Sequence, residues 1–161
     1  MASERAKVLA DDFAAANADT LAFARGCTDR EWALSVPGEG WSIGVVLHHI
    51  AEGHAHGAHW LQGMARGEGV AETAEDIDRV NAEHAVRAEA VGPAETMALL
   101  EVNGNLLEEA LRGLSDEDLD RTAPFGPGGG RKLPTGDLAA VAARHTREHL
   151  AHAREAVARD R

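Results

Sequence analysis

Apolar residues recur every three or four positions along most of the chain, with charged residues between them, which is the period of a helix. The pattern predicts four long helices and one shorter helical segment. The long helices are expected at residues 3 to about 25, about 42–66, 94–112, and 135 or 137 to about 158, and the shorter segment at residues 76–90. Runs of Val, Ile or Thr are few, so no strand is expected.

Glycine and proline mark the breaks between these segments. Residues 27–40 are interpreted as a connection and residues 122–134 as a Gly- and Pro-rich loop. The pair Gly92-Pro93 ends the shorter segment, because proline cannot continue a helix. The sequence therefore predicts an all-α four-helix bundle with one extra short helix, in a single domain covering residues 1–161.

Composition supports this fold class and limits the partners. Ala, Leu, Glu and Arg dominate, and 44% of the 161 residues are hydrophobic, enough to bury a real core. The chain carries 16 Lys and Arg against 27 Asp and Glu, a formal net charge of −11. An acidic surface repels phosphate backbones and anionic lipid, so neither nucleic acid nor a membrane is expected as a partner.

The cysteine count and the apolar runs bear on location. Cys27 is the one cysteine, which excludes an internal disulfide and favours a reducing compartment. No apolar run reaches the length of a membrane span, and the first residues look like the start of a helix rather than a signal segment. A cytoplasmic protein is the expectation.

Nine histidines are an unusual number for this length, and their spacing is informative. On a helical projection of residues 42–66, His49 lies at the edge of the apolar face, while His48 points almost opposite, toward solvent. In the last helix, His145, His149 and His152 are spaced i, i+4 and i+7 and share a stripe with apolar residues. All three are therefore expected to face the core, where an unpartnered imidazole is costly.

This arrangement favours a metal site, although inward histidines can also be ordinary core residues. Two histidines at i and i+4 can chelate one ion, and His49 from another helix is a suitable third ligand. None of the nine histidines follows a Glu by three residues, as di-iron bundles require, and neither a His-Glu-x-x-His motif nor paired cysteines occur. One mononuclear site with nitrogen ligands remains.

Other residues are candidates for the surroundings of this site. Some are expected to line a pocket and others to orient a ligand imidazole, although each can instead be structural. The pocket candidates are Trp41, His56, Trp60 and Asn81, and the orienting candidates are Glu52 and Glu148. Nothing near Cys27 marks it as an activated nucleophile, and residues 126–130 are interpreted as a mobile lid or a plain connector.

At these positions the sequence resembles the DinB-like superfamily, which includes DinB proteins, thiol-dependent S-transferases and the metal domain of mycothiol-dependent maleylpyruvate isomerases. Residues 40–50 (Gly-Trp-Ser-Ile-Gly-Val-Val-Leu-His-His-Ile) look like its second helix, where the metal-binding His falls eight residues after the Trp, at His49. Residues 144–150 resemble its C-terminal His-x-x-x-His, and residues 76–81 its Asn-bearing segment.

The resemblance covers nearly the whole chain. It implies an up-down-down-up four-helix core, a metal ion at one end of the bundle and, often, a homodimer. The family commonly has Gln where this chain has His152. The resemblance therefore leaves the role of His152 open: it could support a metal ligand, be an alternative ligand or contact the substrate.

The expected function follows from the site and the resemblance together. One divalent ion (zinc, nickel or iron) on three imidazoles would activate a low-molecular-weight thiol such as mycothiol, or water, toward a small-molecule substrate, as a transferase or a hydrolase. The alternative is a non-catalytic metal-binding or stress-response module. A surplus of histidines expected to be exposed would suit that alternative: His48, His54, His59 and His84.

Overall fold

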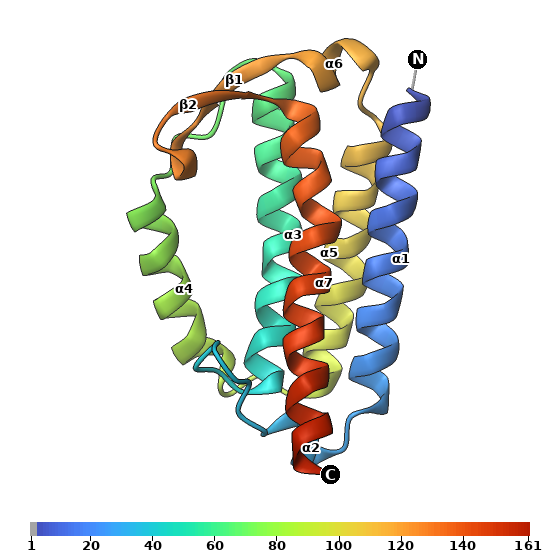
Figure 1. Cartoon of the computed structure of the whole chain (residues 1–161), viewed down its shortest axis with the longest axis vertical. Coiled ribbons are helices and arrows are strands. Elements are labelled where there is room, and N and C mark those ends of the chain that lie inside the picture. Colours follow the sequence, from blue (N-terminus) through green and yellow to red (C-terminus); the bar gives the residue numbers. More distant parts are fainter. Residues whose placement is uncertain (1–2) are drawn as a thin grey trace.

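The computed structural model describes residues 3–161, and within them four long helices pack side by side into a bundle (Figure 1). They are α1 (Glu4–Gly26), α3 (Ile43–Ala65), α5 (Pro93–Arg112) and α7 (Thr135–Asp160). Three short helices connect them: α2 (Asp29–Trp32), α4 (Ala74–Ala88) and α6 (Asp116–Asp120). The predicted four-helix bundle is confirmed, and the predicted bounds agree with the observed ones to within about two residues.

Local sequence explains where the helices begin. The Ser3 hydroxyl accepts a hydrogen bond from the backbone N–H of Ala6, and the Ser42 hydroxyl accepts one from Val45. α4 begins with a reciprocal capping box between Thr73 and its own Asp76. Such caps satisfy backbone N–H groups that the first helical turn leaves without partners.

The helices follow the connectivity that the resemblance implied. In Figure 1, α3 and α5 run in one direction and α1 and α7 in the other, and α3 contacts both α5 and α7. Parallel neighbours need a crossing connection, and α4 supplies it between α3 and α5. α4 stands apart from the bundle, over the side of the α3–α7 pair (Figure 1).

Two segments differ from the prediction. Residues 122–134, predicted as a loop, form an antiparallel hairpin of β1 (Thr122–Phe125) and β2 (Arg131–Pro134) around the 3₁₀ turn η1 (Gly126–Gly128). Each strand has four residues, too few for an alternating pattern to show in the sequence. Residues 27–40, predicted as a connection, include the short α2, which begins with its own capping box.

The core contains a buried polar chain between α1, α3 and α5. The ring of His54 packs edge-on against Phe13, with the ring centroids 4.9 Å apart. Its Nε2–H donates to the Asn17 side-chain oxygen over 3.1 Å, and the Asn17 amide donates to the Leu100 carbonyl over 3.1 Å. Gly104 leaves room for Asn17, since a Cβ there would lie 2.1 Å from the Asn17 amide nitrogen.

The expectation that His54 is exposed is wrong. Only 2% of its surface is accessible. α3 packs against α4, α5 and α7, so it lacks the single broad solvent face that the helical projection assumes.

No helix within residues 3–161 has the length and apolar character needed to span a membrane.

Burial, and then the neighbouring charge of His145, lowers the pKa of His54 to about 3, from an ordinary value of 6.5. The unfolded chain therefore binds a proton at this residue that the folded chain rejects, and stability falls as the pH drops from about 6.5 toward 3. His54→Gln keeps a donor for Asn17 but does not titrate. We predict that the variant loses about 3 kcal/mol less stability than the wild type between pH 7 and pH 4.

The measurement is urea unfolding of metal-free protein at both pH values. The exposed His59 lies on the same helix, and His59→Gln is the matched control, which should follow the wild type. Parallel pH profiles for wild type and His54→Gln would show that His54 does not carry this acid sensitivity.

Candidate functional site

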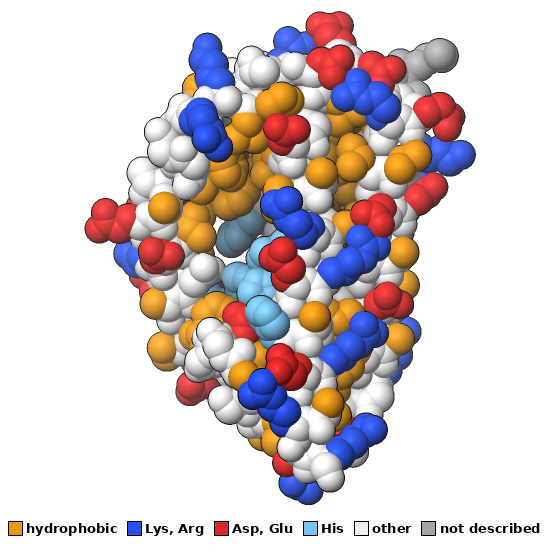
Figure 2. Space-filling view, viewed as in Figure 1, with side chains coloured by type: hydrophobic (Ala, Val, Ile, Leu, Met, Phe, Trp, Pro, Cys, Tyr) orange, Lys and Arg blue, Asp and Glu red, His pale blue; other side chains and the backbone are white. Residues whose placement is uncertain are grey.

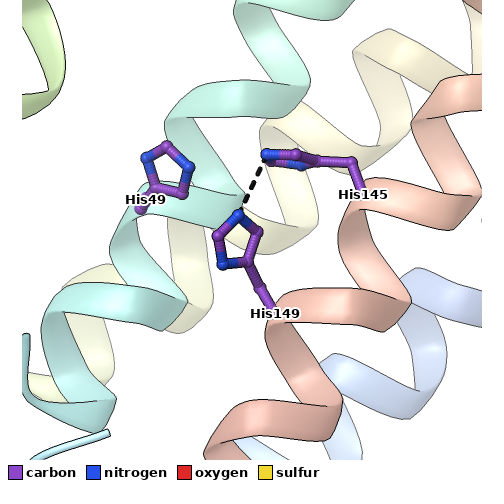
Figure 3. A group of neighbouring side chains, drawn as sticks. All are labelled: His49, His145 and His149. Carbon is purple, nitrogen blue, oxygen red and sulfur yellow. Dashed lines mark hydrogen bonds between the residues drawn. The ribbon is translucent and has the colours of Figure 1, made fainter. Parts of the chain in front are cut away.

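Three of the predicted residues meet between α3 and α7. His145 and His149 reach from α7 toward His49 on α3 (Figure 3), and the three ring centroids lie between 4.5 and 5.4 Å apart. One ring nitrogen from each residue lies within 4.8 Å of the other two, and the Nε2 atoms of His145 and His149 are 3.2 Å apart. The i, i+4 spacing places the two α7 rings one turn apart on the same face of the helix, and the packing of α3 on α7 brings the third ring to them.

Burial sets the protonation state of this cluster. Burial, together with the positive charges of His149 and His145, lowers the pKa of His49 to about 3. Burial and then His149 lower the pKa of His145 to about 4. Both imidazoles are therefore neutral at pH 7, the form in which a ring nitrogen can donate its lone pair to a metal ion.

Glu39 completes the cluster and was not among the predicted site residues. Its Oε1 accepts the Nδ1–H of His149 over 2.9 Å and the Nδ1–H of His152 over 2.6 Å. Burial by itself would raise the pKa of Glu39, but its hydrogen bonds and charge interactions with His152 and His149 outweigh it, and the pKa is lowered. A carboxylate in this position fixes the tautomer of His149 so that Nε2, which faces His145, carries the lone pair.

The turn before α3 carries Glu39 to this position. Gly38 and Gly40 on either side of Glu39 have φ values of 82° and 73°, which favour glycine. The Val36 N–H donates to the Trp41 carbonyl over 2.8 Å and closes the turn. The signal in the sequence that could have identified Glu39 is its position between two glycines, two residues before Trp41.

His152 does not face the core as predicted, since half of its side chain is exposed. It lies at the edge of the α7 stripe, and its hydrogen bond to Glu39 is the contact that connects it to the cluster. Glu148 is also exposed, 3.9 Å from Arg144 on its own helix. The prediction that Glu148 orients a ligand imidazole therefore finds no support in its position.

A cavity of about 510 Å³ opens beside the three histidines. It lies between α3, α7 and α4, and Figure 2 shows it as a hollow with histidines along its lower side and apolar side chains above them. All four predicted pocket residues line it: Trp41, His56, Trp60 and Asn81. The cluster thus lies at one side of a space that can hold a small organic molecule.

A second histidine pair holds α4 near α3. His48 and His84 are 4% and 1% accessible, so the expectation that both face solvent is wrong. Nδ1 of His48 lies 2.8 Å from Nε2 of His84, with Glu52 4.0 Å from each ring. Arg87 lies 3.3 Å from Glu52. The structure therefore places Glu52 beside this pair rather than beside a histidine of the first cluster.

The surroundings of Cys27 agree with the interpretation that its thiol is not an activated nucleophile. Burial, and then the negative charge of Glu31, raises the pKa of its thiol to about 11. A thiol with this pKa is almost fully protonated at pH 7, and the thiolate is the nucleophilic form.

Residues 12–153 match the model of the DinB superfamily. The chain belongs to that superfamily. No curated protein matches the sequence at a significant level.

Solved structures of this superfamily share the fold. YfiT from Bacillus subtilis, described as a probable metal-dependent hydrolase with an unusual four-helix bundle topology, is similar with a TM-score of 0.79 and 20% identity, over 99% of this chain and 89% of YfiT. The mycothiol-dependent maleylpyruvate isomerase is similar with a TM-score of 0.71 and 18% identity, over 92% of this chain and 59% of the isomerase. The DinB fold of this chain thus occurs in proteins described with different reactions.

The cluster leads to a prediction about proton uptake. Because burial keeps His49 and His145 neutral, we expect their imidazole NMR signals in metal-free protein to show no titration between pH 8 and pH 5. Midpoints near 6.5 for His49 and His145 would contradict this description of the site.

Proposed function

We propose that His49, His145 and His149 bind one divalent metal ion, and that this centre activates a low-molecular-weight thiol or water toward a small-molecule substrate. The observation that carries the proposal is the convergence of three imidazole nitrogens, two of them on rings held neutral by burial, at one side of the 510 Å³ cavity. Nitrogen donors of this kind suit zinc, nickel and iron, which leaves the identity of the metal open.

The separation of the two donors on α7 fits such an ion. Two imidazole nitrogens on one tetrahedral zinc ion are about 3.3 Å apart, given zinc–nitrogen bonds of about 2.05 Å. The observed separation of the His145 and His149 Nε2 atoms is 3.2 Å. Three protein ligands also leave a position for a thiol or water, as in catalytic rather than structural zinc sites.

The chain's own residues support this chemistry. A bound divalent ion would lower the pKa of a coordinated thiol or water toward neutrality. Glu39 holds His149 in the ligating tautomer through the bond to its Nδ1–H, and the same carboxylate holds His152 at the solvent side. The apolar side chains of the cavity exclude water from around the substrate, which strengthens electrostatic interactions there.

The comparisons support the reaction class but leave the reaction open. The metal-dependent description of YfiT favours a metal-activated nucleophile, and the name of the isomerase favours a thiol such as mycothiol as co-substrate. This chain spans about three fifths of the isomerase. The homodimer and the cytoplasmic location stay predictions of the sequence.

The alternative of a non-catalytic metal-binding module loses its supporting observation. That alternative depended on four exposed histidines, but His48, His54 and His84 are buried. His59 alone of the four is exposed.

We predict one tightly bound ion per chain in calorimetric titration with zinc or nickel. Alanine at His49, His145 or His149 should lower the affinity at least about 100-fold, and Glu39→Gln about 10- to 100-fold, since it removes the carboxylate that orients His149. His59→Ala is the matched control and should bind like the wild type. Unchanged affinity in all three alanine variants would remove the proposed centre.

The activity is tested on the metal-loaded protein with two reactions in parallel. Thiol conjugation is followed with a chlorodinitrobenzene and either mycothiol or 2-mercaptoethanol, and hydrolysis is followed with 4-nitrophenyl acetate. We expect one of the two to exceed the background rate and to fall to background in His149→Ala, while His59→Ala keeps it. A folded protein that binds one ion and accelerates neither reaction would favour the binding module.

A further inference from the structure

We infer that the cavity selects an uncharged, largely apolar substrate and discriminates against carboxylated molecules of the same shape. This inference rests on the proposed function, because it names the substrate class of the same site. It is carried by the charge and the apolar character of the residues that line the cavity.

The charged groups at the cavity are acidic. Within the described residues 3–161, no Lys or Arg lines the cavity, whereas Glu39 and Asp78 do. A carboxylate entering this space would lose hydration without meeting a Lys or Arg side chain, and that loss is costly.

The opposite side of the cavity is apolar. This wall consists of apolar side chains from α3, α5 and α7, and Pro127 of η1 extends it. The side chains from the helices are Leu61, Leu107, Leu138, Val141 and Ala142. Trp60 also belongs to this wall. Its ring packs edge-on against Phe125, with 5.8 Å between the ring centroids, and its Nε1–H donates a hydrogen bond to Glu72 over 3.4 Å. A wall of this kind stabilises a bound ring or alkyl group by removing apolar surface from water.

Among the described residues that line the cavity, one side-chain amide is available to orient such a molecule. Asn81 of α4 lines the cavity, and its side chain can both donate and accept a hydrogen bond. It therefore suits a carbonyl or hydroxyl group of an uncharged substrate. A volume of about 510 Å³ is in the range of cavities that hold small organic molecules.

A bound ion would attract a carboxylate, but as an inhibitor rather than as a substrate. A substrate carboxylate attracted to the ion would occupy the position that the activated thiol or water needs. Such a molecule would inhibit the centre rather than react at it. Maleylpyruvate, the dicarboxylate in the name of the structurally similar isomerase, is accordingly not expected to be a substrate of this chain.

The binding test uses metal-free protein, so that it does not depend on the metal centre. Tryptophan fluorescence follows titration with 2-naphthylmethanol and with its carboxylated counterpart 2-naphthoate at pH 7.5. We expect the neutral compound to bind at least about tenfold more tightly. Equal binding, or tighter binding of 2-naphthoate, would overturn the inference.

A charge reversal at the cavity supplies the variant. Asp78 is exposed on α4 and lines the cavity, so Asp78→Lys should preserve the fold and bring the two affinities together or reverse their order. Glu83→Lys makes the same charge change at an exposed position of α4 that does not line the cavity, and it should keep the wild-type preference. The same shift in both variants would assign the preference to overall charge and overturn the inference.

Activity assays on the metal-loaded protein distinguish a failure of the proposed selectivity from a failure of the proposed function. 4-Nitrophenyl acetate is compared with the 4-nitrophenyl half-ester of succinic acid, and 1-chloro-2,4-dinitrobenzene with 4-chloro-3,5-dinitrobenzoate. Faster turnover of the carboxylated member of a pair would overturn the selectivity while supporting the proposed function. A preference for naphthylmethanol without any turnover would support the selectivity and contradict the proposed function.

Discussion

The packing of α3 against α7 determines both the register of the helices in the core and the positions of the clustered histidines. It brings a histidine at one edge of α3 opposite two histidines one turn apart on α7. The apolar residues around them, such as Ile50, Leu61 and Leu138, hold the two helices in this register. A rotation of either helix by one residue, about 100°, would separate the rings and expose apolar surface in the same movement. The register of the core and the geometry of the site are therefore fixed by one interaction.

Burial of imidazoles costs free energy, and the structure shows where that cost is offset. His54 is compensated by Asn17, and His48 and His84 by each other. Glu39 compensates His149 through its Nδ1–H, while the nitrogens of the three-histidine cluster face one another and the cavity. The buried histidines thus form one arrangement within the core, one between α3 and α4 in which Nδ1 of His84 has no partner among the described residues, and one that faces the large cavity. This division separates a candidate functional histidine from a core histidine better than burial alone.

Much of this was predictable from the sequence. The helical period fixed the four long helices, and the i, i+4 pair in α7 with one histidine at the apolar edge of α3 was enough to predict that His49, His145 and His149 meet. The exposure of individual histidines was less predictable. α3 is covered on several sides, so His48 and His54 are buried although a projection with one apolar face places them in solvent. Glu39 was missed because a turn brings it to α7 across 110 residues of sequence, and no local pattern encodes that contact. The hairpin at residues 122–134 was missed because its strands are too short to show a period.

Anomalous diffraction from crystals of the zinc- or nickel-loaded protein can locate an ion bound by imidazoles from both helices. We expect one strong anomalous peak per chain, within about 2.0–2.2 Å of a ring nitrogen of each of His49, His145 and His149. A peak on other residues, or none in crystals grown with excess metal, would contradict the proposed metal centre.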